Sequence, residues 1–182
     1  TQTFIFMPRL SIDEVYMDVA YQFAKLSYAS RRKVGCVIVK DNQLVSFGYN
    51  GTPKGFDNQC EDIQEIKISA SYSTSPEIVD DLEDSGFICV DDCCTKTEST
   101  TKREVLHAES NALTKIAKST MSSEGADLYT TTSPCFECSK LIIQSGIKRV
   151  FYSEEYRDIE GLQLLNKAHV DVIRLNRQED GI

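Results

Sequence analysis

Apolar residues recur at helical spacing near the start of the chain. Between Ser11 and Ser27 they fall three or four positions apart, which predicts an amphipathic helix; these residues are Ile12, Val15, Tyr16, Val19, Ala20, Phe23, Ala24 and Leu26. Ser11 followed three residues later by Glu14 is the sequence signature of a capping box. We therefore expect the helix to begin directly after Ser11.

The pattern that follows is typical of two strands. Val34–Val39 and Leu44–Tyr49 are rich in β-branched and aromatic residues, and the polar residues between them favour a turn. We therefore expect an antiparallel hairpin. The second strand leads into Gly48–Gly55, whose three glycines and one proline predict a sharply folded loop.

Residues 57–104 interrupt the periodic pattern with Ser/Thr clusters and acidic runs, and we expect an irregular acidic insertion with one short helix near Glu77–Asp84. Helices and strands then alternate, which implies right-handed crossovers and parallel strands. The helices are expected at about Leu106–Ser119, Pro134–Ser145 and Ile159–Lys167, and the strands at Asp127–Thr132, Arg149–Tyr152 and Val170–Leu175. Residues 1–182 are thus predicted to form one α/β domain with a mixed, about five-stranded sheet between helices.

Charge is distributed unevenly along the chain. The net charge is −8, but residues 57–104 alone hold 13 acidic and 4 basic side chains, so the remainder carries a net charge of +1. An acidic protein is poorly suited to grip a polyanion by releasing its counterions, which weighs against a nucleic acid polymer as partner. A small anionic ligand of the remainder is still compatible with this charge.

The sequence also bears on the compartment. No apolar run reaches the roughly 18 residues of a membrane span, and residues 1–8 lack the basic region and cleavage site of a secretory signal. We therefore expect a cytoplasmic protein without a membrane partner. In such a protein seven cysteines, an odd number, favour metal-bound or catalytic thiolates over disulfides.

Two short motifs about 28 residues apart carry candidate metal ligands. His107-Ala108-Glu109 opens one predicted helix, and Pro134-Cys135-Phe136-Glu137-Cys138 opens the next, with Pro134 at the first helical position. On one helical turn the thiols of Cys135 and Cys138 point the same way. Together with His107 they suit Zn²⁺, and three protein ligands leave the fourth position open for water, as in a catalytic site.

Glu109 indicates what such a site would do. Two residues beyond His107, it leaves the helix from another side, so it is a poor ligand but is well placed to reach the water or a substrate. A carboxylate there can take a proton from the water and pass it to a ring nitrogen and then to leaving ammonia. The residues therefore predict hydrolytic deamination, and H-x-E with P-C-x-x-C is the signature of zinc nucleobase deaminases.

The chain resembles the deoxycytidylate deaminases of the cytidine deaminase-like superfamily from about Ser11 to Leu175, with residues 61–103 matching least. The resemblance is carried by Leu106–Cys138, Val34-Gly35-Cys36, Gly48-Tyr49-Asn50-Gly51-Thr52-Pro53-Lys54-Gly55 and Gln144-Ser145-Gly146-Ile147-Lys148. It implies a three-layer α/β/α cytidine deaminase-like fold. It also implies conversion of dCMP to dUMP for thymidylate synthesis, in a homohexamer activated by dCTP and inhibited by dTTP.

Several residues are candidates for binding the nucleotide. The resemblance implies that Asn50 contacts a sugar hydroxyl, whereas the residues alone favour an asparagine that stabilises a turn. Arg31 and Lys33, on either side of Arg32, lie where a phosphate could bind, and a solvated basic turn is the alternative. The remaining candidates are Ala108, Ser133 through its backbone, and Tyr156, for which ordinary packing is the alternative.

The glycine-rich loop is the candidate site for a regulatory nucleotide, through Gly48, Asn50, Gly51, Lys54 and Gly55. Glycine N–H groups can approach phosphates closely, and Lys54 adds a positive charge. Mg²⁺ would accompany a triphosphate there, with carboxylates of the insertion. The alternative is a loop that only closes the active site.

The insertion raises the question of a second metal. Some relatives hold a structural zinc there with cysteine and histidine ligands, but neither histidine of this chain, His107 or His169, lies in the insertion. The candidate ligands are Cys60, Cys93, Cys94 and Glu104. Because adjacent cysteines do not easily face one metal, this second zinc stays an open alternative.

Two other classes of function share these motifs. One is deamination of another free nucleobase, a nucleoside or a tRNA base; the acidic balance weighs against tRNA, and small tetrameric nucleoside deaminases usually carry cysteine where His107 stands. The other is a zinc-stabilised interaction module without catalysis. Glu109 and the open fourth position weigh against that module.

Overall fold

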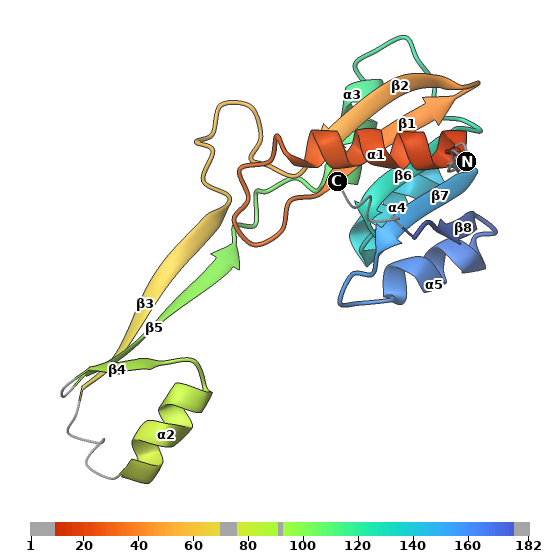
Figure 1. Cartoon of the computed structure of the whole chain (residues 1–182). Helices are drawn as coiled ribbons and strands as arrows, with labels where there is room; N and C mark the ends of the chain where they lie inside the picture. The colour runs from red at the N-terminus through yellow and green to blue at the C-terminus, as the bar shows by residue number, and fades with distance from the viewer. Residues whose placement is uncertain (1–9, 70–75, 91–92, 177–182) are drawn as a thin grey trace, which may run out of the picture. The chain divides into compact units, whose positions relative to one another are not determined.

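The computed structural model describes residues 10–69, 76–90 and 93–176 (Figure 1). The described residues form two compact units: one combines those up to Asn58 with those from Glu104 onward, and the other lies within Gln59–Arg103. Residues 1–8, considered above as a possible signal, lie outside the described residues. In the described part, every helix is too short or too polar to cross a membrane.

The first unit is built on a five-stranded mixed sheet with the strand order β2-β1-β6-β7-β8. The expected hairpin is formed by β1 (Gly35–Lys40) and β2 (Gln43–Tyr49), and β1 also runs antiparallel to β6 (Asp127–Thr132). β7 (Arg149–Glu154) and β8 (Asp171–Arg174) continue the sheet in parallel with β6. The predicted mixed sheet is confirmed.

Helices cover both faces of this sheet (Figure 1). α1 (Ile12–Ala24) packs on one face, where the core contains Met17, Ala20, Val37, Val39, Tyr129 and Phe151. On the other face lie α3 (Ala108–Ile116), α4 (Phe136–Gln144) and α5 (Glu160–Lys167), around a core that includes Ile38, Ala112, Leu128, Ile142, Val150 and Leu165. The predicted three-layer α/β/α architecture is therefore confirmed.

Local sequence explains how these layers form. The capping box begins α1 as expected, because the Glu14 N–H donates to Ser11 Oγ at 3.2 Å and the Ser11 N–H donates to the Glu14 carboxylate at 2.6 Å. Along β1, Val37 and Val39 face α1 while Ile38 faces the opposite core. All three are buried, which explains why this strand is apolar throughout rather than alternating.

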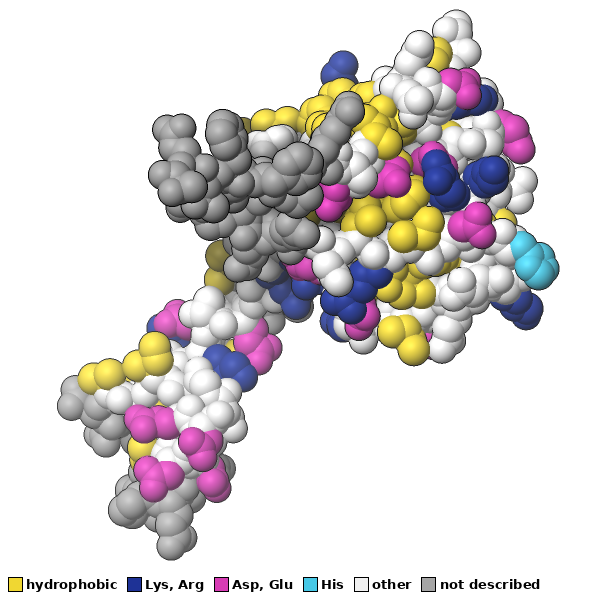
Figure 2. Space-filling model, turned by 45° about the vertical axis from the view of Figure 1, so that its right-hand side comes forward, with side chains coloured by type: hydrophobic (Ala, Val, Ile, Leu, Met, Phe, Trp, Pro, Cys, Tyr) yellow, Lys and Arg dark blue, Asp and Glu magenta, His cyan; other side chains and the backbone are white. Residues whose placement is uncertain are grey.

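The second unit is a three-stranded antiparallel sheet with one helix. β5 (Cys93–Thr101) lies between β3 (Glu61–Ser69) and β4 (Ile88–Val90), and α2 (Pro76–Asp84) is the short helix expected there. The expectation of otherwise irregular structure is wrong, because β3 and β5 are long strands whose side chains are mostly exposed on both faces. Such strands need no alternation of apolar and polar residues, so the usual signal is missing. Figure 2 shows acidic side chains gathered on this unit.

The cysteines of the second unit correct two expectations. Cys89 and Cys94 are cross-strand partners of β4 and β5 and form a disulfide. The expectation that the cysteines serve as thiolates therefore does not hold for these two. Cys60 directly precedes β3, whereas Cys94 pairs with Ile68 near the other end of that strand, roughly 26 Å away at about 3.3 Å per residue. The proposed second zinc set with Cys60, Cys93, Cys94 and Glu104 is therefore wrong.

Candidate active site

The site lies at one edge of the five-stranded sheet, where β1 begins and β2 and β6 end. Gly35 pairs with Tyr49 across β1 and β2, and the Gly35 N–H donates to Thr131 Oγ1 of β6 at 3.2 Å. The chain leaves β6 through Ser133 and Pro134 directly into α4. The three strand ends thus bring the two metal motifs to the same place.

β2 and the loop after it fix the beginning of α3. His107 is the N-cap of this helix, and Leu106 before it exchanges two backbone hydrogen bonds with Gly51, of 3.1 and 2.9 Å. Asn111 Nδ2 donates to the Tyr49 carbonyl at 2.8 Å. Gly48 lies in β2 with no room for a side chain, since a Cβ there would be 2.6 Å from Ala112 N. His107 is therefore held at the edge of the sheet.

The second motif opens α4. Cys135 is the N-cap and Cys138 the third helical residue, so the two side chains meet at the helix start. Pro134 precedes the N-cap and does not occupy the first helical position as expected. Gly161 of α5 packs against this turn, where a Cβ would lie 2.8 Å from the Cys135 carbonyl carbon.

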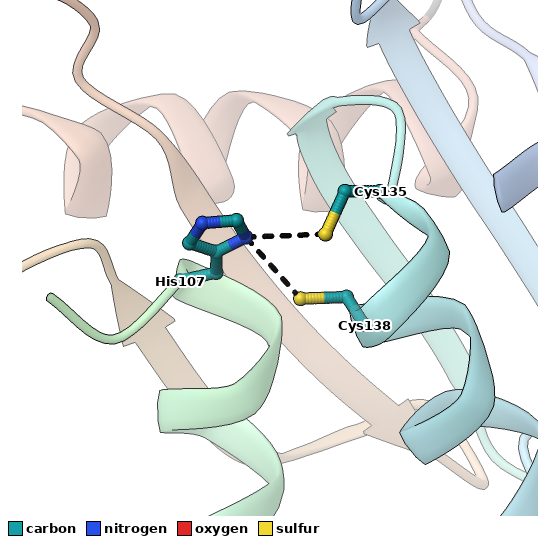
Figure 3. A group of neighbouring side chains, drawn as sticks. All are labelled: His107, Cys135 and Cys138. Atoms are coloured by element: carbon teal, nitrogen blue, oxygen red, sulfur yellow. Dashed lines mark hydrogen bonds between the residues drawn. The ribbon is translucent and has the colours of Figure 1, made fainter. Parts of the chain in front are cut away.

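The three predicted ligands converge (Figure 3). His107 Nδ1 lies 3.4 Å from Cys135 Sγ and 3.5 Å from Cys138 Sγ, and all three ligand atoms lie within 4.8 Å of one another. A tetrahedral zinc with Zn–S near 2.3 Å and Zn–N near 2.0–2.1 Å places such atoms about 3.6 Å apart. The donor set therefore fits Zn²⁺, and among the described residues it is the sole group of three or more potential ligands at such distances.

The electrostatics of the cluster favour a bound cation. A hydrogen bond from the Cys138 thiol lowers the pKa of Cys135 to about 4. The hydrogen bond between His107 and Cys135 raises the pKa of His107. Both shifts reflect a negative charge that forms on the Cys135 sulfur and attracts positive charge, while the pKa of the Cys138 thiol that donates to it is raised.

Glu109 lies beside the ligands and is almost completely buried, with 4% of its surface exposed. Burial raises its pKa to about 7, and the negative charge of Cys135 adds to the shift, while His107 opposes it. Glu109 is the second residue after the N-cap, so its side chain leaves the helix in a different direction from that of His107. A carboxylate in this position can exchange a proton with a group held next to the ligands.

The structure connects some of the candidate nucleotide-binding residues. The Ser133 N–H donates to the Glu154 carbonyl, and Ser133 Oγ accepts from the Tyr156 N–H, both at 2.8 Å. Ser133 thus orients the half-buried Tyr156, whose ring lies under Arg157. Ala108 is completely buried.

The two sides of the first hairpin also meet. The Asn50 side chain bonds the backbone of Arg32 and Val34, 18 and 16 residues earlier, and not groups of its own turn, and Arg31 and Lys33 are exposed nearby. Sequence reasoning missed Ser27, whose hydroxyl bonds the Asn50 carbonyl. No pattern distinguishes that serine from others in a polar segment.

The glycine-rich loop differs from the expectation at its beginning. Gly48 belongs to β2 and is buried beneath α3, so its N–H group is not available to a regulatory phosphate. Gly55 has a φ of 100°, a conformation that only glycine adopts readily, and Lys54 before it is exposed. The Asn50 amide is bonded to the backbone of Arg32 and Val34, so the candidate regulatory segment is shorter than predicted and runs from Gly51 to Gly55.

Several known proteins are similar to this chain in sequence and in fold. Residues 10–154 match the family described as "Cytidine and deoxycytidylate deaminase zinc-binding region". The chain is 32% identical to the ComE operon protein 2 of Bacillus subtilis over 174 residues, 95% of this chain and 76% of that protein. It is 34% identical to the deoxycytidylate deaminase of Enterobacteria phage T4 over 147 residues, 77% of this chain and 76% of that protein.

A solved structure agrees with these likenesses. The crystal structure of dCMP deaminase from the cyanophage S-TIM5, in complex with dCMP and dUMP, is similar with a TM-score of 0.70 at 36% identity. The likeness covers 93% of this chain and 100% of that chain.

Proposed function

The chain belongs to the cytidine and deoxycytidylate deaminase family, and from this premise we propose that it hydrolyses dCMP to dUMP and ammonia. The observation that carries the proposal is the cluster of His107, Cys135 and Cys138 beside the buried Glu109. The choice of dCMP is supported by the phage T4 relative and by the cyanophage enzyme, whose structure contains dCMP and dUMP.

The reaction replaces the amino group on the cytosine ring by oxygen from water. His107, Cys135 and Cys138 would hold zinc, which would supply an acidified water to the reaction. Glu109 accepts the proton of the water and delivers it to the ring nitrogen. It then takes the remaining proton of the added hydroxyl group and transfers it to the departing amino group, so that one water is consumed and one ammonia released. Burial keeps bulk water from competing with Glu109 for these protons.

We place the phosphate of dCMP at Arg31 and Lys33. Both are exposed at the sheet edge where β1 begins. Arg32 between them is paired with Glu154 at 3.3 Å. Charge-assisted hydrogen bonds to a phosphate are stronger than neutral ones, so the phosphate should contribute much of the binding energy. Ala108, Ser133 and Tyr156 complete the proposed nucleotide site around the sugar and base.

The proposal includes regulation. dCTP activates and dTTP inhibits by binding with Mg²⁺ at Gly51, Lys54 and Gly55, in a homohexamer that supplies dUMP for thymidylate synthesis in the cytoplasm. Support comes from the exposed Lys54 and from the backbone link between Gly51 and Leu106, which connects this loop to His107. Initial rates against dCMP concentration should be sigmoidal alone and hyperbolic with dCTP, while curves unaffected by either triphosphate would contradict this part.

Ammonia release from dCMP, dCTP, deoxycytidine, cytidine and guanine, measured in parallel, tests the main proposal. We expect the highest kcat/KM for dCMP. Equal efficiency with deoxycytidine would show that no phosphate site exists. Faster release from guanine than from dCMP would assign the chain to another substrate class.

A further inference from the structure

We propose that Asn50 is a positioning residue that fixes the backbone of Lys33, and through it the basic segment Arg31–Lys33, for recognition of the substrate phosphate. The inference rests on the proposed function and deepens it. It differs from a direct contact between Asn50 and the sugar, because it assigns the energetic effect of Asn50 to the phosphate.

The side chain of Asn50 brackets Lys33. Its Oδ1 accepts from the Val34 N–H at 2.8 Å, and its Nδ2 donates to the Arg32 carbonyl at 2.8 Å. These two groups belong to the peptide units on either side of Lys33. An amide that holds both units restricts the backbone dihedrals of Lys33, much as a neighbouring strand does.

The backbone of Asn50 holds the same segment. Its N–H donates to the Val34 carbonyl at 3.1 Å, and its carbonyl accepts from Ser27 Oγ at 2.8 Å. Ser27 Oγ in turn accepts from the Ala29 N–H at 3.2 Å, and both Ser27 and Ala29 are buried, each 3% exposed. The chain between α1 and β1 is thus tied to Asn50 at both of its ends.

The bonding pattern requires an asparagine. One acceptor and one donor on the same planar group are needed, and aspartate in its ionised form has no donor for the Arg32 carbonyl. Alanine would leave both backbone groups without these partners, and the basic segment would gain conformational freedom.

Hydrogen bonds link the basic segment Arg31–Lys33 to the metal ligands through Asn50. Gly51, the residue after Asn50, exchanges two backbone hydrogen bonds with Leu106, and His107 follows. Lys33, Asn50 and His107 are therefore connected through a few backbone hydrogen bonds. The distance between a phosphate at Lys33 and a base at His107 is set by this connection, so loosening it should weaken the phosphate contact more than the chemistry.

The test compares dCMP with deoxycytidine in matched variants. Asn50→Ala should lower kcat/KM for dCMP on the order of 10- to 100-fold, because the basic segment then loses its hydrogen bonds to the charged phosphate of the substrate. The loss should appear mainly in KM, and kcat/KM for deoxycytidine should change by less than about threefold. Amide hydrogen exchange at Val34 should become faster in the same variant.

Ser27→Ala provides a second variant that cannot act by touching the substrate, because Ser27 is buried. It should lower kcat/KM for dCMP selectively, by roughly threefold to tenfold, since one neutral hydrogen bond contributes less. Ser123→Ala is the matched control. It also removes a hydroxyl-to-carbonyl hydrogen bond of 2.8 Å, but near the beginning of β6 rather than at its end, and should leave the preference for dCMP unchanged.

A double-mutant cycle shows whether Asn50 acts through Lys33. In a Lys33→Ala background, Asn50→Ala should have little further effect on dCMP, whereas independent contributions would add. Equal losses for dCMP and deoxycytidine, or additivity in the cycle, would overturn the positioning role. A wild-type protein without a preference for dCMP would instead refute the proposed function itself, so the two failures are distinguishable.

Discussion

Replacing Gly48 by alanine would place a methyl group between β2 and α3. A Cβ built at this position meets the Ala108 carbonyl oxygen and lies 2.6 Å from Ala112 N. Both contacts are backbone atoms of α3, which cannot move aside as a flexible side chain can. The helix that presents His107 and Glu109 must therefore shift as a whole.

The size of the shift follows from these contacts. An ordinary contact of a Cβ atom begins at 3.4 Å, so Ala112 N must retreat by at least 0.8 Å. Overpacking of this kind costs about 2 kcal/mol of unfolding free energy, which lowers the unfolding temperature of a chain this long by about 4–8 °C. A displacement near 1 Å at the reacting groups lowers turnover on the order of 10²-fold.

Circular dichroism during heating measures the first effect, because the chain contains no tryptophan for fluorescence. Steady-state turnover of dCMP below the transition measures the second. Gly51→Ala is the stability control, since its Cβ would have nothing within 4 Å, and it should change the unfolding free energy by less than about 0.5 kcal/mol. An unchanged unfolding temperature for Gly48→Ala would contradict the close packing of α3. Lower stability with unchanged kcat/KM would separate that packing from catalysis.

Three further predictions concern the metal and the folding of α1. Cys138→Ala should purify with little or no zinc and without activity, and metal analysis that finds full occupancy would contradict its assignment as a ligand. Gly161→Ala pushes against the Cys135 turn and should weaken zinc affinity about 10-fold to 100-fold in a chelator competition; unchanged affinity would show that α5 does not support the site. Ser11→Ala removes the capping box and should cost about 1 kcal/mol, or about 2–4 °C in unfolding temperature, without changing zinc content.

Sequence patterns predicted the first unit because local and long-range requirements agree there. The capping box at Ser11, the apolar run of β1 and the alternation of helices and strands each have a direct physical signal. The metal ligands were predictable for the same reason, since the spacing of Cys135 and Cys138 places both thiols at the start of one helix.

The second unit was not predictable in this way. β3 and β5 pair over nine residues although both are largely polar, and their stability depends on pairing between segments that lie far apart in the sequence. The same pairing sets the cysteine chemistry, because it brings Cys89 opposite Cys94 and leaves Cys60 at the other end of the sheet. Composition alone contains neither relationship.

The role of Asn50 illustrates a different limit. Its position after a strand and before glycine indicates a turn residue, but the partners of its amide come from a segment 16 and 18 residues earlier. Only the register of β1 against β2 identifies them. That register turns a local turn residue into a link between the basic segment and the metal ligands.

Glu109→Gln tests the central claim most directly, with zinc content and turnover of dCMP measured on the same sample. Glutamine keeps the size of the buried side chain but cannot accept the proton, so zinc should stay at one per chain while kcat falls on the order of 10²-fold or more. Glu137→Gln is the matched control. Glu137 stands two residues after Cys135 as Glu109 stands after His107, but its side chain is 76% exposed and paired only with Lys140 among the contacts described, so its loss should have little effect. Near-normal turnover of Glu109→Gln with zinc in place would contradict the proposed reaction.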